Sequence, residues 1–181
     1  MTKQDILNKI FELKAVAVVR MNNTDKLKKV VDAIYKGGVA AIEITMTTPG
    51  ALQSIESLSK SMGDEILVGV GSVIDKQMAS DAINAGAKFV VSPIFKKVLI
   101  EIAHQNDVLA IPGCFTPTEI QTAYEAGADV VKVFPADVVG MSFFKGVLAP
   151  LPHLKLMPTG GVSLTNAGDW IIAGACAVGI G

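Results

Sequence analysis

Short apolar segments alternate with longer amphipathic segments along the whole chain, and this alternation most restricts the fold. Most of the apolar segments are rich in β-branched residues and bounded by glycine or proline, as buried strands are. The eight predicted strands are residues 15–20, 39–45, 66–71, 88–92, 108–112, 129–135, 154–158 and 176–180. Eight strands alternating with helices predict an α/β fold of the (β/α)₈ TIM barrel type. A doubly wound open sheet is the alternative, but the chain has no G-x-G-x-x-G fingerprint.

Helix signals lie between the predicted strands. Thr24 and Ser163 are predicted to cap helices, and Pro49 to stand in the first turn of another. Thr116 and Glu119 have the spacing of a capping box. Apolar residues at helical spacing predict an additional helix at the N-terminus, before the first strand. The predicted helices cover residues 5–13, 24–35, 49–62, 75–85, 93–105, 116 onward, 141–149 and 163–173.

The eighth predicted strand ends at Ile180, one residue before Gly181, the last residue of the sequence. A barrel of this kind has a helix after its eighth strand, so we expect that the final helix is missing. We therefore expect one barrel domain over residues 1–181, truncated after strand eight. The outer face of the last strand should then expose apolar surface.

The composition fits one compact domain with a large core, since 50% of the 181 residues are hydrophobic and 18% are charged. The net charge is −1 and no basic run interleaves with aromatic residues, which argues against nucleic acid and anionic membranes as partners. Two cysteines and two histidines argue against a zinc site. No signal peptide and no apolar run near 18 residues is present, so we expect a soluble, cytoplasmic protein.

A single lysine, Lys132, lies in the middle of the apolar segment Asp-Val-Val-Lys-Val-Phe-Pro at residues 129–135. Burial removes water from an ammonium group and lowers its pKa. A lysine perturbed in this way is a nucleophilic amine near neutral pH. The alternative is a lysine near the end of its strand whose ammonium reaches solvent.

Glu43 occupies the matching position of another predicted strand. Four of the turns that lead into strands contain a glycine, and the residues five positions later are Glu43, Val91, Lys132 and Gly179. They belong to strands two, four, six and eight, and alternate strands of a barrel supply one layer of inward side chains. We therefore expect Glu43 and Lys132 to face each other near the C-terminal mouth, with Gly179 leaving space. A buried ion pair that only specifies the fold is the alternative.

Further candidate residues follow the strands at the same mouth. Ser72 offers a hydroxyl after the third strand. Arg20, at the end of the first strand, can either bind an anion or end its strand in solvent. Glycines after strands seven and eight of a barrel commonly form a phosphate cradle. The glycines at these places are Gly160, Gly161, Gly179 and Gly181.

Several motifs occur in a recognisable order. They are Ile-Glu-Ile-Thr at 42–45, Gly-Val-Gly-Ser-Val at 69–73, Ser-Pro at 92–93, Ile-Pro-Gly at 111–113, Val-Lys-Val-Phe-Pro at 131–135 and Pro-Thr-Gly-Gly-Val at 158–162. In this order they resemble the 2-keto-3-deoxy-6-phosphogluconate (KDPG) aldolase family, which includes the 4-hydroxy-2-oxoglutarate (KHG) and 6-phosphogalactonate aldolases. The resemblance covers essentially the whole chain. It implies a class I aldolase that needs no metal or cofactor, a (β/α)₈ barrel and commonly a homotrimer.

The resemblance also implies roles for individual residues. Lys132 matches the family's Schiff-base lysine, and Glu43 matches its general acid and base. Ser72 stands where the family often has a threonine that contacts the carboxylate of the pyruvyl group. The matching pocket and phosphate-site positions are Pro93, Phe134, Thr159, Gly160 and Gly161.

Two features depart from the family pattern. Many members carry a carboxylate-binding arginine four residues after the glutamate, where this chain, like some relatives, has Thr47. Arg20 is the candidate to supply that recognition instead. The family's phosphate loop also continues past the position of Gly181 into a serine and a final helix.

The implied reaction is cleavage of a small, phosphorylated 2-keto-4-hydroxy acid to pyruvate and an aldehyde. Lys132 would form an iminium with the C2 ketone, and Glu43 would move the protons. One alternative is a phosphate-binding barrel isomerase or epimerase. Another is a catalytically weak or inactive barrel that serves as a binding or oligomeric scaffold.

Overall fold

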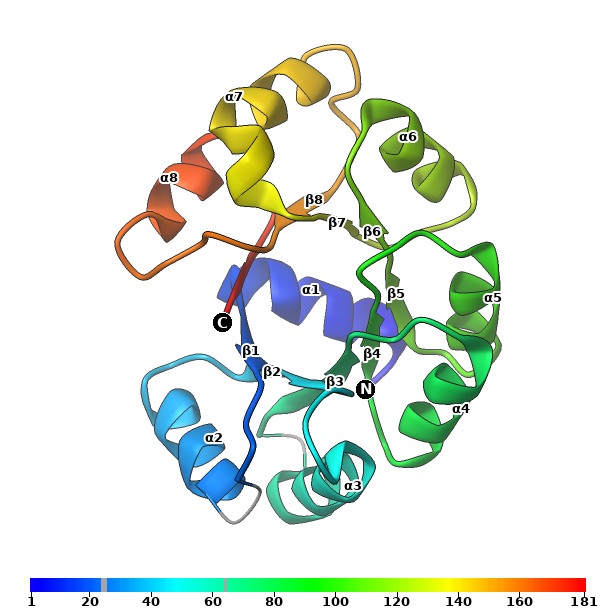
Figure 1. The fold of residues 1–181 in the computed structure, drawn as a ribbon, viewed down its shortest axis with the longest axis vertical. Coiled ribbons are helices and arrows are strands. Elements are labelled where there is room, and N and C mark those ends of the chain that lie inside the picture. The colour runs from blue at the N-terminus through cyan, green and yellow to red at the C-terminus, as the bar shows by residue number, and fades with distance from the viewer. Residues whose placement is uncertain (24–25, 64) are drawn as a thin grey trace.

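The computed structural model describes residues 1–23, 26–63 and 65–181, and places parallel strands at the centre of a ring of helices (Figure 1). The described strands are β1 (Ala15–Val19), β2 (Ala41–Thr45), β3 (Leu67–Gly71), β4 (Phe89–Val91), β5 (Leu109–Ile111), β6 (Gly113–Cys114), β7 (Val131–Val133), β8 (Leu156–Pro158) and β9 (Val178–Ile180). They form a six-stranded sheet of order β5-β4-β3-β2-β1-β9 and a three-stranded sheet of order β6-β7-β8. The predicted parallel α/β fold is therefore confirmed.

The break between the two sheets falls where the sequence predicted a single strand over residues 108–112. Pro112 separates β5 from β6, and proline has no N–H group to donate to a neighbouring strand. Backbone hydrogen bonds still cross both boundaries between the sheets. Asp129 N donates to Ala110 O over 3.1 Å, and Cys176 N donates to Leu156 O over 2.9 Å.

Helices follow the strands in the expected alternation. Their bounds are α1 (Lys3–Leu13), α2 (Leu27–Lys36), α3 (Ala51–Met62), α4 (Lys76–Asn84), α5 (Lys97–Gln105), α6 (Pro117–Glu125), α7 (Ala136–Leu148) and α8 (Ala167–Ile172). The predicted capping box is confirmed, because Thr116 Oγ1 accepts from Glu119 N while the Glu119 carboxylate accepts from Thr116 N. The predicted cap at Thr24 lies outside the described residues.

The predicted starts of three helices, α3, α5 and α8, lie before the observed ones. Helix α5 begins at Lys97, four residues after its predicted start at residue 93. Helix α3 begins at Ala51 after Gly50, whose φ of 65° is left-handed, so Pro49 lies before the helix. Helix α8 begins at Ala167, and its N-cap is Asn166 and not Ser163, three residues later than predicted. The reason is a local turn, in which Ser163 N donates to Asn166 Oδ1 and Ala167 N donates to Ser163 O. Asparagine competes effectively for such backbone bonds.

Helix α7 also begins earlier than predicted, because one helical turn follows β7 immediately. Gly140, with φ of 72° and ψ of 174°, separates this turn from the predicted helical segment. Only glycine adopts such angles without strain. The early turn places Asp137 beside the loop that contains Gly160 and Gly161.

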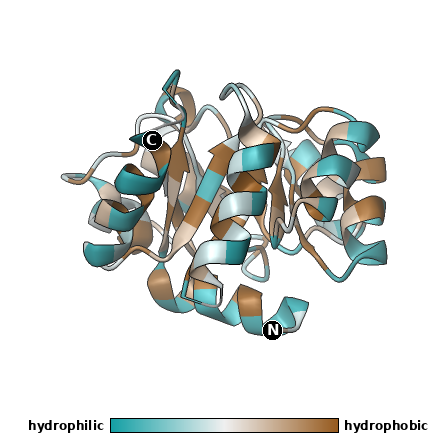
Figure 2. Cartoon of the chain, turned by 90° about the horizontal axis from the view of Figure 1, so that it is seen from below, coloured by the Kyte–Doolittle hydropathy of each residue, from teal (hydrophilic) through white to brown (hydrophobic). Residues whose placement is uncertain are grey.

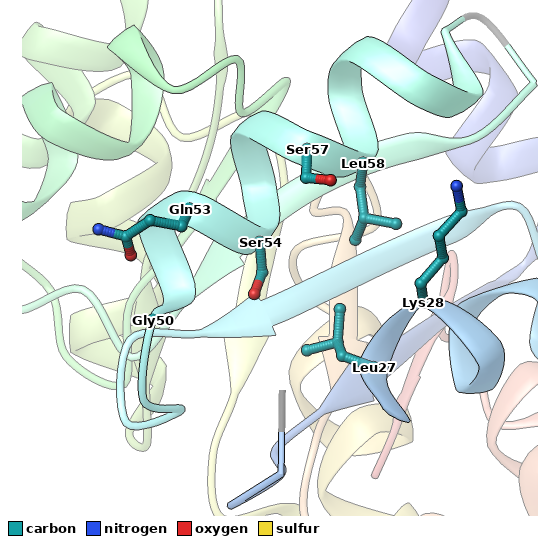
Figure 3. A pocket seen from close by; sticks show the side chains of 7 residues that line it. All are labelled: Leu27, Lys28, Gly50, Gln53, Ser54, Ser57 and Leu58. Carbon is teal, nitrogen blue, oxygen red and sulfur yellow. The ribbon is translucent and has the colours of Figure 1, made fainter. Parts of the chain in front are cut away.

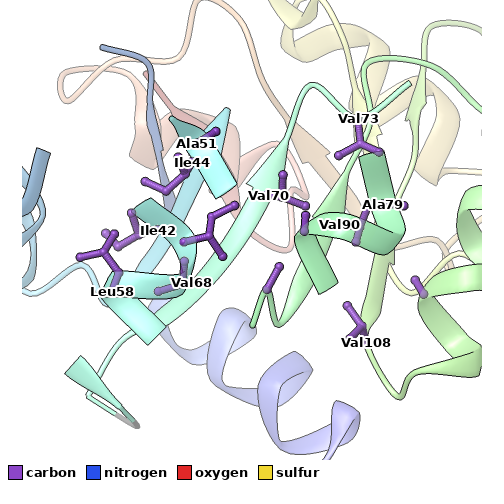
Figure 4. Close-up of a cluster of buried hydrophobic side chains, with 14 of the residues drawn as sticks. Ile42, Ile44, Ala51, Leu58, Val68, Val70, Val73, Ala79, Val90 and Val108 are labelled. Atoms are coloured by element: carbon purple, nitrogen blue, oxygen red, sulfur yellow. The ribbon is translucent and has the colours of Figure 1, made fainter. Parts of the chain in front are cut away.

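The core has an inner and an outer part, as the residues of β2 show. All five residues of β2 are buried. Ile42 and Ile44 pack outward with Leu58 of α3 in a cluster between strands and helices (Figure 4). Alternate residues such as Ala41 belong to an inner cluster with Ile6 and Ile10 of α1. The period of two in a strand produces this division.

Helix α1 closes the amino-terminal ends of the strands. It lies across one end of the strand assembly, away from the C-terminus (Figure 2). Its amphipathic sequence places Ile6 and Ile10 against the first residues of several strands, including Leu67 and Leu109. The carboxyl ends of the strands remain accessible at the opposite end, which is where parallel barrels carry their active sites.

The expected apolar outer face is present beside β1 and β9. A cavity of about 380 Å³ there is lined by backbone and apolar side chains, among them Val18, Ile34, Val39, Leu164 and Ile180. Leu164 at its edge is 89% exposed.

Candidate active site

Lys132 is buried in the middle of β7. Both neighbours in the strand are buried and the lysine itself is only 6% exposed, so the alternative of a solvent-exposed ammonium does not hold. Desolvation lowers the pKa of Lys132, opposed by the negative charge of Glu43 and assisted by Arg20. Its Nζ lies 4.8 Å from the centre of the Phe134 ring. The amine is therefore easier to deprotonate than an ordinary lysine.

Glu43 is buried in the middle of β2 and is 1% exposed. Desolvation raises the pKa of its carboxyl, while Lys132 and then Arg20 act in the opposite direction. Among the described residues no salt bridge joins Glu43 to Lys132. Glu43 Oε2 is buried without a hydrogen-bond partner in the described chain. A buried polar atom of this kind usually has a partner, so the carboxylate has an oxygen free for a ligand.

Glycines on neighbouring strands make room for these groups. A Cβ atom at Gly71 of β3 would lie 2.8 Å from Glu43 Cγ and would overlap the carboxylate. A Cβ atom at Gly179 would lie 3.2 Å from Thr159 Cγ2. Gly71 thus accommodates the Glu43 carboxylate, and Gly179 accommodates the side chain of Thr159.

A cavity of about 330 Å³ brings together most of the residues predicted to bind substrate. The predicted residues that line it are Arg20, Phe134, Thr159, Gly160, Gly161 and Gly181, and Val18 and Val162 complete it. Thr159 Oγ1 is buried without a hydrogen-bond partner in the described chain. A guanidinium, a free hydroxyl and accessible glycine backbone are groups that bind anions.

A second hollow of about 260 Å³ shares the Phe134 ring with this cavity. It is lined on the other side by Pro93 and by apolar residues that include Ile94 and Phe115. Cys114, which also lines it, is not a nucleophile near neutral pH. Burial, and then the charge of Glu119, raise the pKa of its thiol to about 12.

Thr47 and Ser72 lie outside both hollows. Thr47 is exposed, and its Oγ1 lies 3.0 Å from Thr45 Oγ1. Ser72 directly follows Gly71 at the carboxyl end of β3 and has a φ of 60°. Residues other than glycine rarely adopt this backbone conformation, and those that do are often found at ligand sites.

A third hollow, of about 280 Å³, contains none of the predicted site residues. It lies between α2 and α3 and is lined by Leu27, Lys28, Gly50, Gln53, Ser54, Ser57 and Leu58 (Figure 3). None of the polar residues there is buried.

The described residues show two further absences. Over residues 1–23, 26–63 and 65–181, no three His, Cys, Asp or Glu side chains are grouped so that they could hold a metal ion. In the same part of the chain no helix is long and apolar enough to cross a membrane.

The arrangement around Lys132 is suited to one class of chemistry. An amine with a lowered pKa adds to a ketone, and a neighbouring carboxyl can transfer the protons that carbinolamine and iminium formation require. The fold and site thus define an α/β enzyme of the class that forms a Schiff base with a carbonyl substrate.

Comparison with known proteins agrees with this class. The family model for KDPG and KHG aldolases matches residues 6–181. The chain is 33% identical over 171 residues to the 2-dehydro-3-deoxy-phosphogluconate aldolase of Haemophilus influenzae, covering 94% of this chain and 80% of the relative. It is 32% identical over 171 residues to the 2-dehydro-3-deoxy-6-phosphogalactonate aldolase of Escherichia coli, covering 94% and 83%.

A solved structure is also similar. It is the KDPG aldolase from Legionella pneumophila, with pyruvate captured at low pH as a covalent carbinolamine. The match has a TM-score of 0.88 and 26% identity, and covers 96% of this chain and 85% of that one. The chain therefore belongs to the KDPG and KHG aldolase family.

Proposed function

We propose that this protein is a class I aldolase that cleaves KDPG, or a related 2-keto-4-hydroxy acid, to pyruvate and an aldehyde. The observation that carries the proposal is the buried Lys132 amine, with its lowered pKa, near a buried Glu43 carboxyl that has a free oxygen. The carbinolamine captured in the Legionella enzyme supports the same chemistry. The aldehyde is glyceraldehyde 3-phosphate for a phosphorylated substrate, or glyoxylate for KHG.

In the proposed reaction the neutral Lys132 amine adds to the C2 ketone and forms a carbinolamine. Glu43, protonated, gives its proton to the departing hydroxyl, and water leaves as the iminium forms. The Glu43 carboxylate then takes the proton of the C4 hydroxyl while the C3–C4 bond breaks. The bonding electrons move into the iminium to give an enamine, and the aldehyde leaves. Protonation at C3 and hydrolysis release pyruvate and restore the Lys132 amine. The raised pKa of Glu43 suits it to both roles.

We assign the phosphate end of the substrate to the cavity beside Phe134. The assignment is supported by the presence in one cavity of Arg20, Thr159, Gly160, Gly161 and Gly181, with Gly179 leaving space for Thr159. Arg20 is assigned to the phosphate rather than to the carboxylate. The pyruvyl carboxylate is assigned to the hydroxyl of Ser72, which directly follows Gly71 beside the Glu43 carboxyl.

We further propose that the strands close into a complete (β/α)₈ barrel and that residues 1–181 form a single domain. Support comes from the contacts that cross both sheet boundaries. Thr159 and Gly179 form a parallel bridge between β8 and β9. Asp129 N donates to Ala110 O across the other boundary.

A homotrimer in the cytoplasm is the proposed state of the protein. The family resemblance supports the trimer, as do exposed apolar side chains around the mouth, where Ile94 is 43% and Phe115 39% exposed. The cytoplasm is supported by two free cysteines, Cys114 and Cys176, since free thiols are typical of a reducing compartment.

The competing function is an inactive barrel that serves as a binding or oligomeric scaffold. The open apolar cavity beside β1 and β9 is the observation that favours it. The scaffold hypothesis predicts no turnover by the folded protein, whereas the aldolase hypothesis predicts release of pyruvate.

Pyruvate release separates the two functions. The purified protein is incubated with KDPG, its galactonate epimer and KHG, and pyruvate is measured with a coupled dehydrogenase. We expect release with at least one substrate, loss of release in Lys132→Met, and normal release in the control Lys155→Met, which changes an exposed lysine. No release from folded protein with any substrate would favour the scaffold.

A further inference from the structure

A chain of threonine hydroxyls begins at Thr45, the last residue of β2, and the proposed reaction gives Thr45 and Thr48 no role. Thr45 Oγ1 lies 3.0 Å from Thr47 Oγ1 and 3.2 Å from Thr48 Oγ1. Thr45 and Thr48 are buried. Thr48 Oγ1 also accepts a hydrogen bond from Met21 N over 3.4 Å. The hydroxyls therefore join the loop after β2 to the loop after β1.

Arg20 is the residue whose position this link determines. It lies directly before Met21 and is the one charged residue among the described residues that line the 330 Å³ cavity. Arg20 is exposed, and its guanidinium forms no ion pair with the other described residues, so the position of its backbone sets where the side chain can reach. A side chain with several rotatable bonds binds an anion well only where its backbone is fixed.

The same hydroxyls connect Arg20 to the strand that carries Glu43. Thr45 is two residues after Glu43 in β2, so both side chains point to the same face of the strand. Val19 is paired with Ile44 across β1 and β2, which places Arg20 beside Thr45 in the register. The hydroxyl chain thus fixes the arginine relative to the proposed acid and base.

We propose that Thr48 is a positioning residue that, through the Met21 N–H, holds Arg20 at the cavity and so sets the affinity for the phosphate end of the substrate. The inference rests on the proposed function in its choice of substrate. Its binding test does not need turnover, because inorganic phosphate serves as the probe.

The first experiment measures phosphate binding to the full chain by ³¹P NMR titration. Thr48→Val keeps the branched shape but removes the hydroxyl, and should weaken phosphate binding about tenfold, the effect of one lost hydrogen bond. Thr48→Ser keeps the hydroxyl and should remain within about twofold of the wild type. If Thr48→Val does not fold, Thr48→Ala removes the same hydroxyl without adding bulk.

A double-mutant cycle separates positioning from a general disturbance of the fold. If Thr48 acts through Arg20, then Arg20→Gln and Arg20→Gln/Thr48→Val should bind phosphate equally weakly. With a phosphorylated substrate that the wild type cleaves, Thr48→Val should raise KM about tenfold and leave kcat within about twofold of the wild-type value. Three results would each overturn the inference. The double variant could lose phosphate affinity by the product of the two single losses, Thr48→Val could bind phosphate as the wild type does, or the wild type could bind no phosphate.

Failure of the proposed function gives a different result. Pyruvate trapping on Lys132 by borohydride depends on the amine and not on the phosphate end. A normal adduct with unchanged phosphate binding in Thr48→Val would reject the positioning role alone. Loss of the adduct in the wild type would reject the Schiff-base chemistry and leave the phosphate result to decide the role of Thr48.

Discussion

Gly71→Ala offers a test of the proposed acid and base without changing Glu43 itself. A Cβ atom at this position would lie 2.5 Å from Glu43 Cδ and 2.8 Å from Cγ. Carbon atoms in contact lie about 3.5–4.0 Å apart, so the carboxyl group must move by about 1 Å or more. A misplacement of about 1 Å near the reacting atoms costs on the order of 10²-fold in rate. This corresponds to about 2.7 kcal/mol of transition-state stabilisation.

The assay is steady-state pyruvate release, with thermal unfolding measured alongside it. Gly71 has no left-handed φ, so alanine fits the backbone. The loss of activity should therefore arise from displacement of the Glu43 carboxyl. Gly146→Ala is the matched control, because a Cβ atom there has no neighbour within 4 Å. In the Glu43→Gln background, Gly71→Ala should cost much less, since both changes affect one group. Activity within twofold of the wild type in Gly71→Ala would refute the assignment of Glu43 as acid and base.

Three further predictions concern charge and burial. The pKa of the Lys132 amine, measured from the pH dependence of its acylation by a lysine-labelling reagent, should lie below 10.5. Glu43→Gln should lower this pKa further and Arg20→Gln should raise it. Asp129→Ala should lower the free energy of unfolding by about 2 kcal/mol in denaturant titrations, because its partly buried carboxylate accepts from Lys3, His104 and Ala110 N, each over 2.8 Å. Cys114 in the native protein should react with iodoacetamide far more slowly at pH 8 than in the unfolded chain, as mass spectrometry would show, because the pKa of its thiol is raised to about 12.

The sequence was sufficient to locate the strands and to single out Lys132 and Glu43. Counting from the glycine turns works because side chains alternate along a strand and parallel strands keep a fixed register. An isolated charge in an apolar segment is also conspicuous, and both residues are indeed buried. What each does in catalysis remains a prediction.

Features that depend on local competition or on separate loops were not predictable. Helix α8 starts later than predicted because the Asn166 side chain accepts a hydrogen bond from Ser163 N and forms a turn there. Pro112 divided one predicted strand into two. The bond from Met21 N to Thr48 Oγ1 joins residues 27 positions apart, and the only trace of it in the sequence is the run Thr-Met-Thr-Thr after Glu43.

Covalent trapping of pyruvate on Lys132 tests the central claim most directly. The folded protein is incubated with pyruvate, reduced with borohydride, digested and analysed by mass spectrometry. The proposed chemistry predicts a reduced pyruvyl adduct confined to Lys132 and absent from Lys132→Met. An adduct on other lysines only, or no adduct on folded protein, would contradict it.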